Sequence, residues 1–180
     1  MRIVGGTHRG RVIRPPKGLP VRPTTDQAKE GLFNILMHRF DLAGAKVLDC
    51  FAGTGNMSYE FLSRGAAQVQ AVDQNARCIH FIKETFQQLG AAGSVARRAK
   101  VNTFLNQENA KYDIIFMDPP YGMDGITDLI QSCFSRALLA ADGLVILEHT
   151  VQEDYQNIPQ FYELRKYGSS AFTFFTLSDS

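Results

Sequence analysis

The stretch "AKVLDCFAGTGNMSYEFLSRGA", residues 45–66, predicts a strand, a tight glycine loop and a helix in direct succession. In an open α/β sheet, the loop after such a strand lies at the carboxyl edge, where ligands bind. Gly53 and Gly55 would let the backbone approach a ligand there. A dinucleotide fingerprint needs a third glycine three positions after Gly55, and Ser58 stands there instead, which argues against a dehydrogenase.

Strand and helix patterns alternate on both sides of this stretch. Helices are predicted over residues 26–40, 75–90 and 125–140, and strands over residues 68–74, 94–101, 112–118 and 143–149. The tail, residues 161–177, has two strand-like runs around a Gly-Ser-Ser turn and predicts a terminal hairpin. Because parallel strands need crossover connections, the alternation predicts a mostly parallel α/β sheet of order 3-2-1-4-5, covered by helices on both faces.

Composition favours one compact domain. The chain has 180 residues, of which 44% are hydrophobic and 21% charged. Three widely spaced cysteines form neither a disulfide framework nor a zinc motif, so a reducing cytoplasmic location and no metal are expected. We find no apolar signal segment and no run approaching the roughly 20 residues of a spanning helix, so no membrane association is expected.

Charge is concentrated at the N-terminus although the net charge is only +1. Six of the 19 basic residues and none of the 18 acidic residues lie in residues 1–25, so this segment carries +6 and the remainder −5. The six are Arg2, Arg9, Arg11, Arg14, Lys17 and Arg22. The glycines and prolines of the segment predict a short hairpin or ribbon that could bind nucleic-acid phosphates. The alternative is a solvated, partly disordered N-terminus.

Two acidic residues near the glycine loop point to a nucleoside ligand. Asp73 ends the second strand about 20 residues after the loop, where a carboxylate accepts hydrogen bonds from ribose hydroxyls. Asp49 lies just before the loop and could face a ligand ammonium, although an acid near a helix N-terminus is also a common structural device.

A rigid polar tetrapeptide follows the predicted strand at residues 112–118. It consists of Asp118, Pro119, Pro120 and Tyr121. The two prolines remove backbone donors, so the loop presents acceptors, and in the expected strand order it adjoins the glycine loop. The Asp118 carboxylate and the Pro119 carbonyl suit a nucleobase amine with two N–H donors, and Tyr121 offers a ring for stacking. This combination predicts chemistry at an exocyclic amine, with Asp118 orienting the amine and helping its proton leave.

Five segments resemble the RsmD family of Rossmann-like S-adenosylmethionine-dependent methyltransferases, in order and over nearly the whole chain. They are "MRIVGGTHRGR", "RPTTDQAKEGLFNIL", "VLDCFAGTGNMSYEFLSRGA", "DIIFMDPPY" and "GLVILEH". The resemblance implies a class I methyltransferase fold with a seven-stranded, mostly parallel sheet and a small N-terminal β-hairpin extension. It further implies that residues 1–25 form an RNA-binding arm and residues 26–180 the methyltransferase domain.

The activity implied by this resemblance is methylation of the N2 amine of guanine 966 in bacterial 16S ribosomal RNA during small-subunit maturation. Residues 118–121 would hold the guanine, and the six basic residues of the arm would bind the RNA. Candidate S-adenosylmethionine contacts are Asp49, Phe51, Gly53, Gly55, Asn56, Asp73 and Asn102. The expected partner is 16S ribosomal RNA, the small subunit or its assembly intermediate, and the protein is expected to be a monomer.

The chain departs from the family pattern at two places. Lys29 stands where the family usually has Arg, and Lys100 or Asn102 occupies the place of an Asp that would accept a hydrogen bond from the adenine amine. Asn102 could accept that bond through its side-chain carbonyl, whereas Lys100 could not. Two alternatives remain open: an adenine-N6 methyltransferase acting on DNA, and a non-catalytic RNA-binding assembly factor that retains the cofactor pocket.

Overall fold

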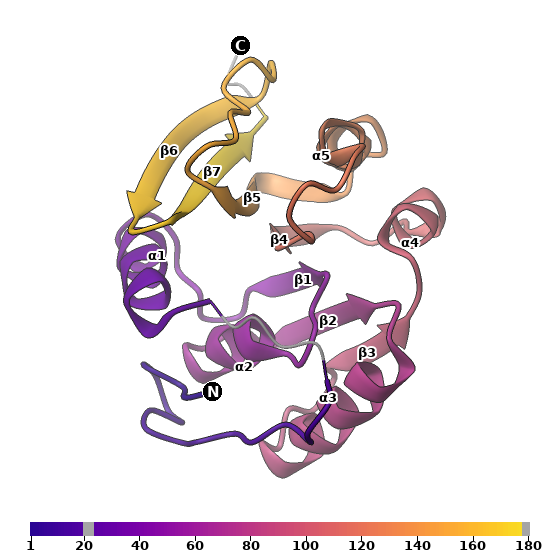
Figure 1. Cartoon of the computed structure of the whole chain (residues 1–180). Coiled ribbons are helices and arrows are strands. Elements are labelled where there is room, and N and C mark those ends of the chain that lie inside the picture. Colours follow the sequence, from indigo (N-terminus) through magenta and orange to yellow (C-terminus); the bar gives the residue numbers. More distant parts are fainter. Residues whose placement is uncertain (20–23, 178–180) are drawn as a thin grey trace.

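A computed structural model describes residues 1–19 and 24–177 and contains one seven-stranded sheet (Figure 1). The strand order is β3-β2-β1-β4-β5-β7-β6. The strands are β1 (Lys46–Cys50), β2 (Gln68–Asp73), β3 (Val95–Arg98), β4 (Tyr112–Met117), β5 (Leu139–Thr150), β6 (Phe161–Tyr167) and β7 (Ser170–Thr176). Strands β1 to β5 are parallel, and β7 pairs antiparallel with both β5 and β6. The predicted order and the terminal hairpin are therefore confirmed.

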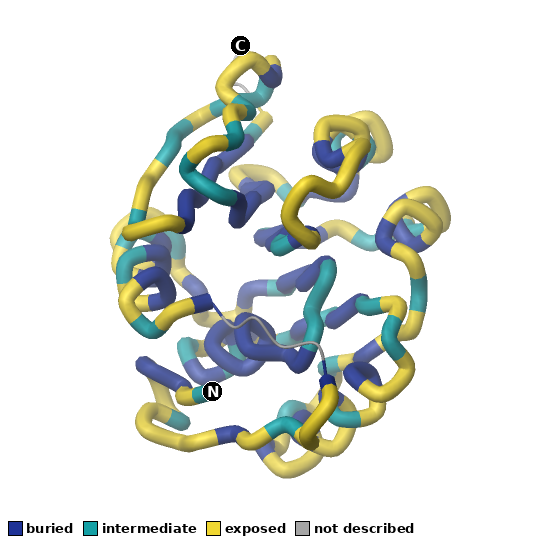
Figure 2. The backbone as a smooth tube through the Cα atoms, viewed as in Figure 1, coloured by how far each residue is buried: buried dark blue, intermediate teal, exposed yellow. Residues whose placement is uncertain are grey.

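Five helices cover the sheet, as the alternation predicted. They are α1 (Asp26–Arg39), α2 (Asn56–Ser63), α3 (Ala76–Gln88), α4 (Val101–Gln107) and α5 (Ile126–Ser135). Apolar side chains of α1, α2 and α3 join one core cluster, and those of α4 and α5 join a second cluster on the other face. Neighbouring strand residues divide between the clusters, since Val47 belongs to the first and Leu48 to the second. Burial on both faces explains why the central strands β1 and β4 are largely apolar along their whole length (Figure 2).

Local signals set the beginning of α1 and α3. The hydroxyl of Thr25 accepts a hydrogen bond from the Ala28 backbone N–H at 3.2 Å and caps α1. The Asn75 side chain caps α3 in the same way, by accepting from Arg77 and Cys78. Because Asn75 lies only two residues after the end of β2, its cap fixes how α3 leaves the carboxyl edge of the sheet.

The N-terminal segment, residues 1–14, is docked on the body of the protein. It folds back on itself, with the Ile3 N–H donating to the Arg11 carbonyl at 3.0 Å and an antiparallel bridge between Arg2 and Val12. Ile3 and Ile13 are buried in the core cluster that contains α1 and α2. This part of the arm therefore has its own hydrophobic anchor and differs from the solvated, disordered alternative.

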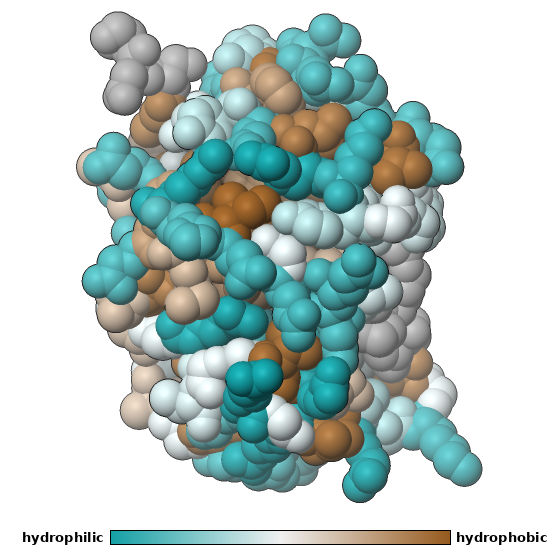
Figure 3. Space-filling view, turned by 90° about the vertical axis from the view of Figure 1, so that its left-hand side faces the viewer, coloured by the Kyte–Doolittle hydropathy of each residue, from teal (hydrophilic) through white to brown (hydrophobic). Residues whose placement is uncertain are grey.

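On the face shown in Figure 3, hydrophobic residues are interspersed among hydrophilic ones. Such a mixture is typical of surface that remains in contact with water. Among the residues that the structure describes, no helix is long and apolar enough to cross a membrane.

Candidate active site

The loops that follow β1, β2, β3 and β4 surround a cleft of about 1060 Å³. Most of the predicted site residues line it: Asp49, Phe51, Gly53, Asn56, Asp73, Asn102, Asp118, Pro119, Pro120 and Tyr121. Gly55 is the one predicted cofactor residue that is missing from the lining. Predicted site residues up to 72 positions apart in the sequence therefore meet at the carboxyl edge of the sheet, as expected for an open α/β fold.

The two glycines of the loop after β1 are needed for different structural reasons. A Cβ on Gly53 would meet no atom within 4 Å, whereas a Cβ on Gly55 would lie 2.5 Å from the ring of Tyr59. Gly55 also has φ 85° as the residue that begins α2. The Tyr59 hydroxyl donates to the Thr54 carbonyl at 2.7 Å and so fixes the loop from inside. Gly53 also has a left-handed φ, 55°, but the space beside it is open to a ligand, whereas Gly55 is in addition required by internal packing.

Phe51 adopts a strained conformation beside the cleft. Its φ is 59°, a left-handed value that costs a bulky residue of the order of 1–3 kcal/mol. The surrounding structure holds this conformation, since the next residue, Ala52, donates its N–H to the Val72 carbonyl at 2.9 Å. Strain of this kind clusters at ligand sites, where it places a side chain that an ordinary turn would direct elsewhere.

Asp73 is held by two backbone donors. One carboxylate oxygen accepts the Gly53 N–H at 2.9 Å and the other accepts the Asn75 N–H at 2.8 Å. A carboxylate has about four acceptor positions, so two remain for a ligand. The same residue therefore shapes the glycine loop and presents acceptors to the cleft.

Asp49 is an almost fully buried carboxyl group, with 1% of its surface exposed. The Ser58 hydroxyl donates to it at 2.5 Å. Burial raises the pKa of Asp49 to about 7, although the hydrogen bonds from Ser58 act in the opposite direction. A cationic ligand group placed beside it would favour the ionised form. Ser58, which excluded a dinucleotide fingerprint in the sequence, thus has a structural role as the partner of Asp49.

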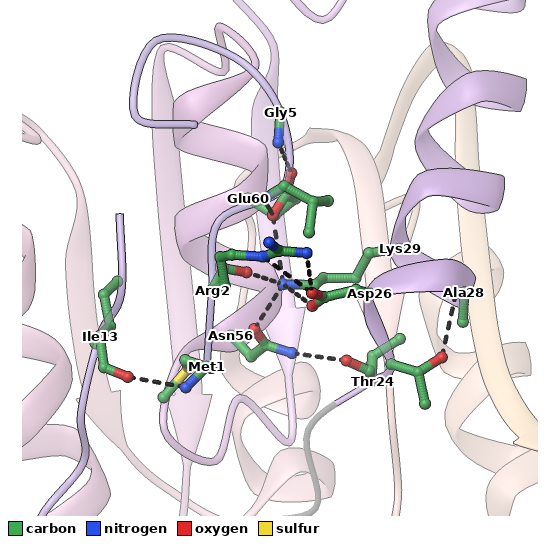
Figure 4. Close-up of polar contacts among 12 residues, drawn as sticks. Met1, Arg2, Gly5, Ile13, Thr24, Asp26, Ala28, Lys29, Asn56 and Glu60 are labelled. Atoms are coloured by element: carbon green, nitrogen blue, oxygen red, sulfur yellow. Dashed lines mark hydrogen bonds and ion pairs between the residues drawn. The ribbon is translucent and has the colours of Figure 1, made fainter. Parts of the chain in front are cut away.

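Asn56 is held by a network that includes the N-terminal segment (Figure 4). Its side-chain oxygen accepts from the Lys29 ammonium at 3.0 Å, and its side-chain nitrogen donates to the Thr24 carbonyl at 3.3 Å. The Lys29 ammonium also donates to the Arg2 carbonyl at 2.5 Å and pairs with Glu60 at 3.5 Å. The predicted cofactor residue Asn56 therefore has protein partners on both sides of its amide.

Glu60 and Lys29 form a buried ion pair beneath the arm. Glu60 is fully buried and accepts the backbone N–H groups of Val4 at 3.0 Å and Gly5 at 2.9 Å. Burial lowers the pKa of Lys29, and the neighbouring Glu60 and Asp26 carboxylates partly compensate for it. Figure 4 shows these groups converging between the arm and α1. Glu60 also pairs with Arg64 at 2.9 Å, so loss of Lys29 would leave Glu60 one cationic partner, whereas loss of Glu60 would remove the nearest carboxylate of Lys29.

Lys100 and Asn102 both line the cleft near the start of α4, and both are exposed. The Asn102 side-chain oxygen accepts the Thr103 backbone N–H at 2.8 Å. This oxygen is the atom that would accept from an adenine amine. The Thr103 hydroxyl also donates to it, at 3.4 Å, so an adenine amine would have to replace this longer bond.

The tetrapeptide of residues 118–121 lies next to the glycine loop. The register pairs Cys50 of β1 with Met117 of β4, and the Asp118 N–H approaches the Cys50 carbonyl at 3.5 Å. Pro119 is buried, whereas Tyr121 is 48% exposed. The Met123 N–H donates to the Pro120 carbonyl at 3.2 Å and closes the turn. The loop thus has a buried base and an exposed aromatic tip at the mouth of the cleft.

The predicted RNA-binding residues fall into three groups. Arg9, Arg11, Arg14 and Lys17 are exposed. Arg2 is also exposed, but its guanidinium donates twice to Asp26, at 2.8 and 3.1 Å. Arg22 lies outside the described residues. The structure therefore presents four described arm cations to solvent without such a carboxylate partner.

Several residues that line the cleft were not predicted from the sequence. Thr24, Met123, Asp124 and Asp128 line the cleft as well. Thr24 stands next to a helix cap, and the other three follow a proline-rich turn. The available signal was their closeness in sequence to predicted site residues.

Comparisons with known proteins agree with this geometry. The family model described as Conserved hypothetical protein 95 matches residues 1–176. Ribosomal RNA small subunit methyltransferase D of Escherichia coli (strain K12) is 30% identical over 92% of this chain and 83% of the relative. The protein of the same name from Haemophilus influenzae is 30% identical over 82% of this chain and 78% of the relative.

Solved structures extend the likeness to the whole fold. A methyltransferase-like protein from Escherichia coli superimposes with a TM-score of 0.85 at 30% identity, over 97% of this chain and 96% of the other. A hypothetical protein from Thermus thermophilus gives a TM-score of 0.84 at 28% identity, over 98% and 99%. The fold is thus the Rossmann-like class I methyltransferase fold, and the chain belongs to the RsmD family, whose model matches it from residue 1 to residue 176.

Proposed function

We propose that this protein transfers a methyl group from S-adenosylmethionine to the exocyclic N2 amine of a guanine in 16S ribosomal RNA, at position 966, during small-subunit maturation. The observation that supports this most directly is the contact between the two loops of the cleft. The Asp118 N–H lies 3.5 Å from the Cys50 carbonyl, so a loop of acceptors adjoins a nucleoside-type pocket. The named relatives are methyltransferases of small-subunit ribosomal RNA.

The residues on the β1 and β2 side fit S-adenosylmethionine. The two free acceptor positions of Asp73 match the two ribose hydroxyls, and the buried Asp49 carboxyl matches the ammonium of the amino-acid part. Gly53 leaves room for the ligand beside the loop, and Asn102 lines the cleft, where its side-chain oxygen would accept from the adenine amine in place of the Thr103 hydroxyl. When bound, S-adenosylmethionine supplies an electrophilic methyl group on a sulfonium.

The residues on the β4 side fit the amine that receives the methyl group. The Asp118 carboxylate and the Pro119 carbonyl would accept its two N–H groups and direct the nitrogen lone pair toward the sulfonium. Asp118 would then help the proton leave. Tyr121, half exposed at the mouth, offers a face for stacking a base turned out of its helix. The transfer is direct, without metal or covalent enzyme intermediate.

The arm supplies affinity for the RNA. We propose that residues 1–25 form the RNA-binding segment and residues 26–180 the catalytic domain, and that the protein acts as a cytoplasmic monomer. Docking of residues 1–14 on α2 places the exposed Arg9, Arg11 and Arg14 at a fixed position relative to the glycine loop, because α2 begins where that loop ends. Neutralising these three arginines should weaken RNA binding and flatten its salt dependence.

An adenine-N6 methyltransferase acting on DNA could use the same acceptor loop. The similarity to methyltransferases of small-subunit ribosomal RNA favours the guanine. An RNA-binding assembly factor without activity is the other alternative. Calorimetric titration with S-adenosylmethionine together with a methyl-transfer assay tests it, since the enzyme must both bind this ligand and transfer its methyl group.

Mass mapping of ribosomal RNA from cells with and without this gene identifies the modified nucleotide. We expect one guanine of 16S ribosomal RNA to lose a methyl group on N2 in the deletion strain. The purified protein should restore that group in vitro with S-adenosylmethionine. Identical ribosomal RNA modification maps from the two strains would contradict the proposal. So would mass analysis of their DNA that showed an adenine methyl group missing from the deletion strain.

A further inference from the structure

Exposed cations gather beside one rim of the cleft, where the last described cation of the arm, Lys17, meets α3. They come from three segments: Lys17, Arg77 of α3, Arg98 of β3, and Lys100. The Arg77 guanidinium donates to the Lys17 carbonyl at 3.3 Å. The Arg98 guanidinium donates to the Gln74 carbonyl at 3.2 Å. We call these four residues the α3–β3 rim.

The geometry of the rim directs its charges toward solvent. Gln74 and Lys100 both line the cleft, so Arg98 is held at the cleft edge by a carbonyl of one lining residue and lies two positions before the other. Strand β3 is at the edge of the sheet and packs beside α3 (Figure 1). Backbone carbonyls orient the two guanidinium groups without neutralising them.

Within the described parts of the chain, none of the four residues forms an ion pair. Four other arginines differ in this respect. Arg2 pairs with Asp26, Arg64 with Glu60, and Arg39 and Arg165 with Glu163. The rim therefore retains four positive charges for an external partner.

The opposite rim has the opposite sign. Residues 112–135 contain four acidic residues and no Lys or Arg. Three of the four, Asp118, Asp124 and Asp128, line the cleft. A polyanion that approaches the cleft is therefore attracted to one rim and repelled by the other.

We infer that the α3–β3 rim binds the phosphates of the RNA nucleotides that flank the target guanine. The inference rests on the proposed function and adds a second phosphate-binding surface to the arm. With its phosphates held on the basic rim, a nucleotide can extend only its uncharged base toward the acidic rim. The base carries the N–H donors that the carboxylate and carbonyl acceptors of that rim can bind. The charge difference thus sets the orientation in which the nucleotide enters.

The test compares two double variants with equal loss of charge. Arg77→Gln/Arg98→Gln removes two rim cations but leaves Lys100, which lines the cofactor cleft, unchanged. The control, Lys111→Gln/Lys166→Gln, removes two exposed cations that have no ion pair, one next to the amino end of β4 and one on β6. The measurements are KM and kcat for methylation of deproteinised 16S ribosomal RNA from cells lacking this protein, and the salt dependence of RNA binding.

We expect the rim variant to raise KM for RNA about tenfold at low salt and to lower the salt slope by about 1.4, since each single-stranded phosphate contact contributes about 0.7. Calorimetric affinity for S-adenosylmethionine should equal that of the wild type. Arg77→Lys/Arg98→Lys should restore most of the slope, because it retains the charges. The control should match the wild type.

The inference would be overturned if the rim variant kept the wild-type KM for RNA and the wild-type salt slope while Arg9→Gln/Arg11→Gln/Arg14→Gln showed a raised KM and a lower slope. The proposed function would then remain intact. An equal loss in the control variant would also overturn the inference, because net charge alone would then explain the effect. A wild-type protein that transfers no methyl group to this RNA or to small subunits isolated from the same cells would instead contradict the proposed function.

Discussion

Asp49 and Asp118 lie at the ends of the neighbouring strands β1 and β4, yet their surroundings differ. Asp49 is buried and accepts a hydrogen bond from Ser58, and the nearby Asp73 accepts two backbone N–H groups. Asp118 is partly exposed, on a loop stiffened by two prolines and ending in the half-exposed Tyr121. One half of the cleft is thus preorganised by internal hydrogen bonds for a small ligand. The other half is open to a macromolecule.

This comparison predicts that substitutions in the two halves separate cofactor binding from transfer. The largest effect is expected for Asp118→Ala, which should slow methylation by about 10²–10⁴-fold, the usual contribution of a positioned acid or base. Calorimetric affinity for S-adenosylmethionine should not change. Asp124→Ala is the matched control, since it removes another acid from the same rim, and it should keep near wild-type turnover. Undiminished turnover in Asp118→Ala would remove the proposed role.

The second expected effect is a loss of cofactor affinity in Asp73→Ala. Two hydrogen bonds to a charged acceptor contribute about 1.5–3 kcal/mol each, so the dissociation constant for S-adenosylmethionine should rise by at least about 100-fold. RNA affinity should remain that of the wild type, which calorimetry and a filter-binding assay can measure separately. Asp73→Asn keeps one acceptor and should lose less. Wild-type cofactor affinity in the alanine variant would show that Asp73 only shapes the loop.

A third effect concerns the open half. Tyr121→Ala should lower kcat/KM for RNA by about 5- to 100-fold, because stacking of one base contributes about 1–3 kcal/mol. Tyr121→Phe keeps the ring and should remain close to the wild type. A phenylalanine variant as impaired as the alanine variant would assign the effect to the hydroxyl and would contradict stacking.

The two halves also differ in how well the sequence predicted them. The tetrapeptide and the glycine loop are each one short stretch of sequence that directly follows a predicted strand. Because alternating strands and helices bring the ends of the parallel strands together, it was predictable that these two loops are neighbours. The reason for Gly55, its approach to Tyr59, was not, because it depends on side-chain packing.

The polar network around Lys29 could not be predicted from the sequence either. It joins Arg2, Lys29, Asn56 and Glu60, which are separated by up to 58 positions, and no periodicity links them. The sequence showed Lys29 only as a departure from the usual family Arg, and the buried Glu60 looked like an ordinary helical acid. Polar contacts between residues so far apart in the sequence can be predicted only once the three-dimensional fold is known.

The smallest effect is expected at the closed half, where Asp49 should make cofactor affinity depend on pH. Burial raises the pKa of Asp49 to about 7, so the carboxyl is mostly neutral below that pH and ionised above it. The ligand ammonium attracts only the ionised form. The affinity for S-adenosylmethionine should therefore rise between pH 6 and pH 8, by at most about tenfold per pH unit. Calorimetry should show no such rise for 5′-methylthioadenosine, which lacks the ammonium.

Asp49→Asn should remove the pH dependence and weaken S-adenosylmethionine binding about tenfold at pH 8. It should also raise the melting temperature of the ligand-free protein above pH 7. The sign follows from linkage: the pKa of the folded state lies above the unfolded value of 3.8, so the folded state holds its proton more tightly and loses stability as the pH rises from about 4 to about 7. Asparagine carries no charge to bury and avoids that loss. A variant that melts lower and binds as tightly as the wild type at pH 8 would show that Asp49 serves the fold through Ser58 and has no part in holding the ammonium.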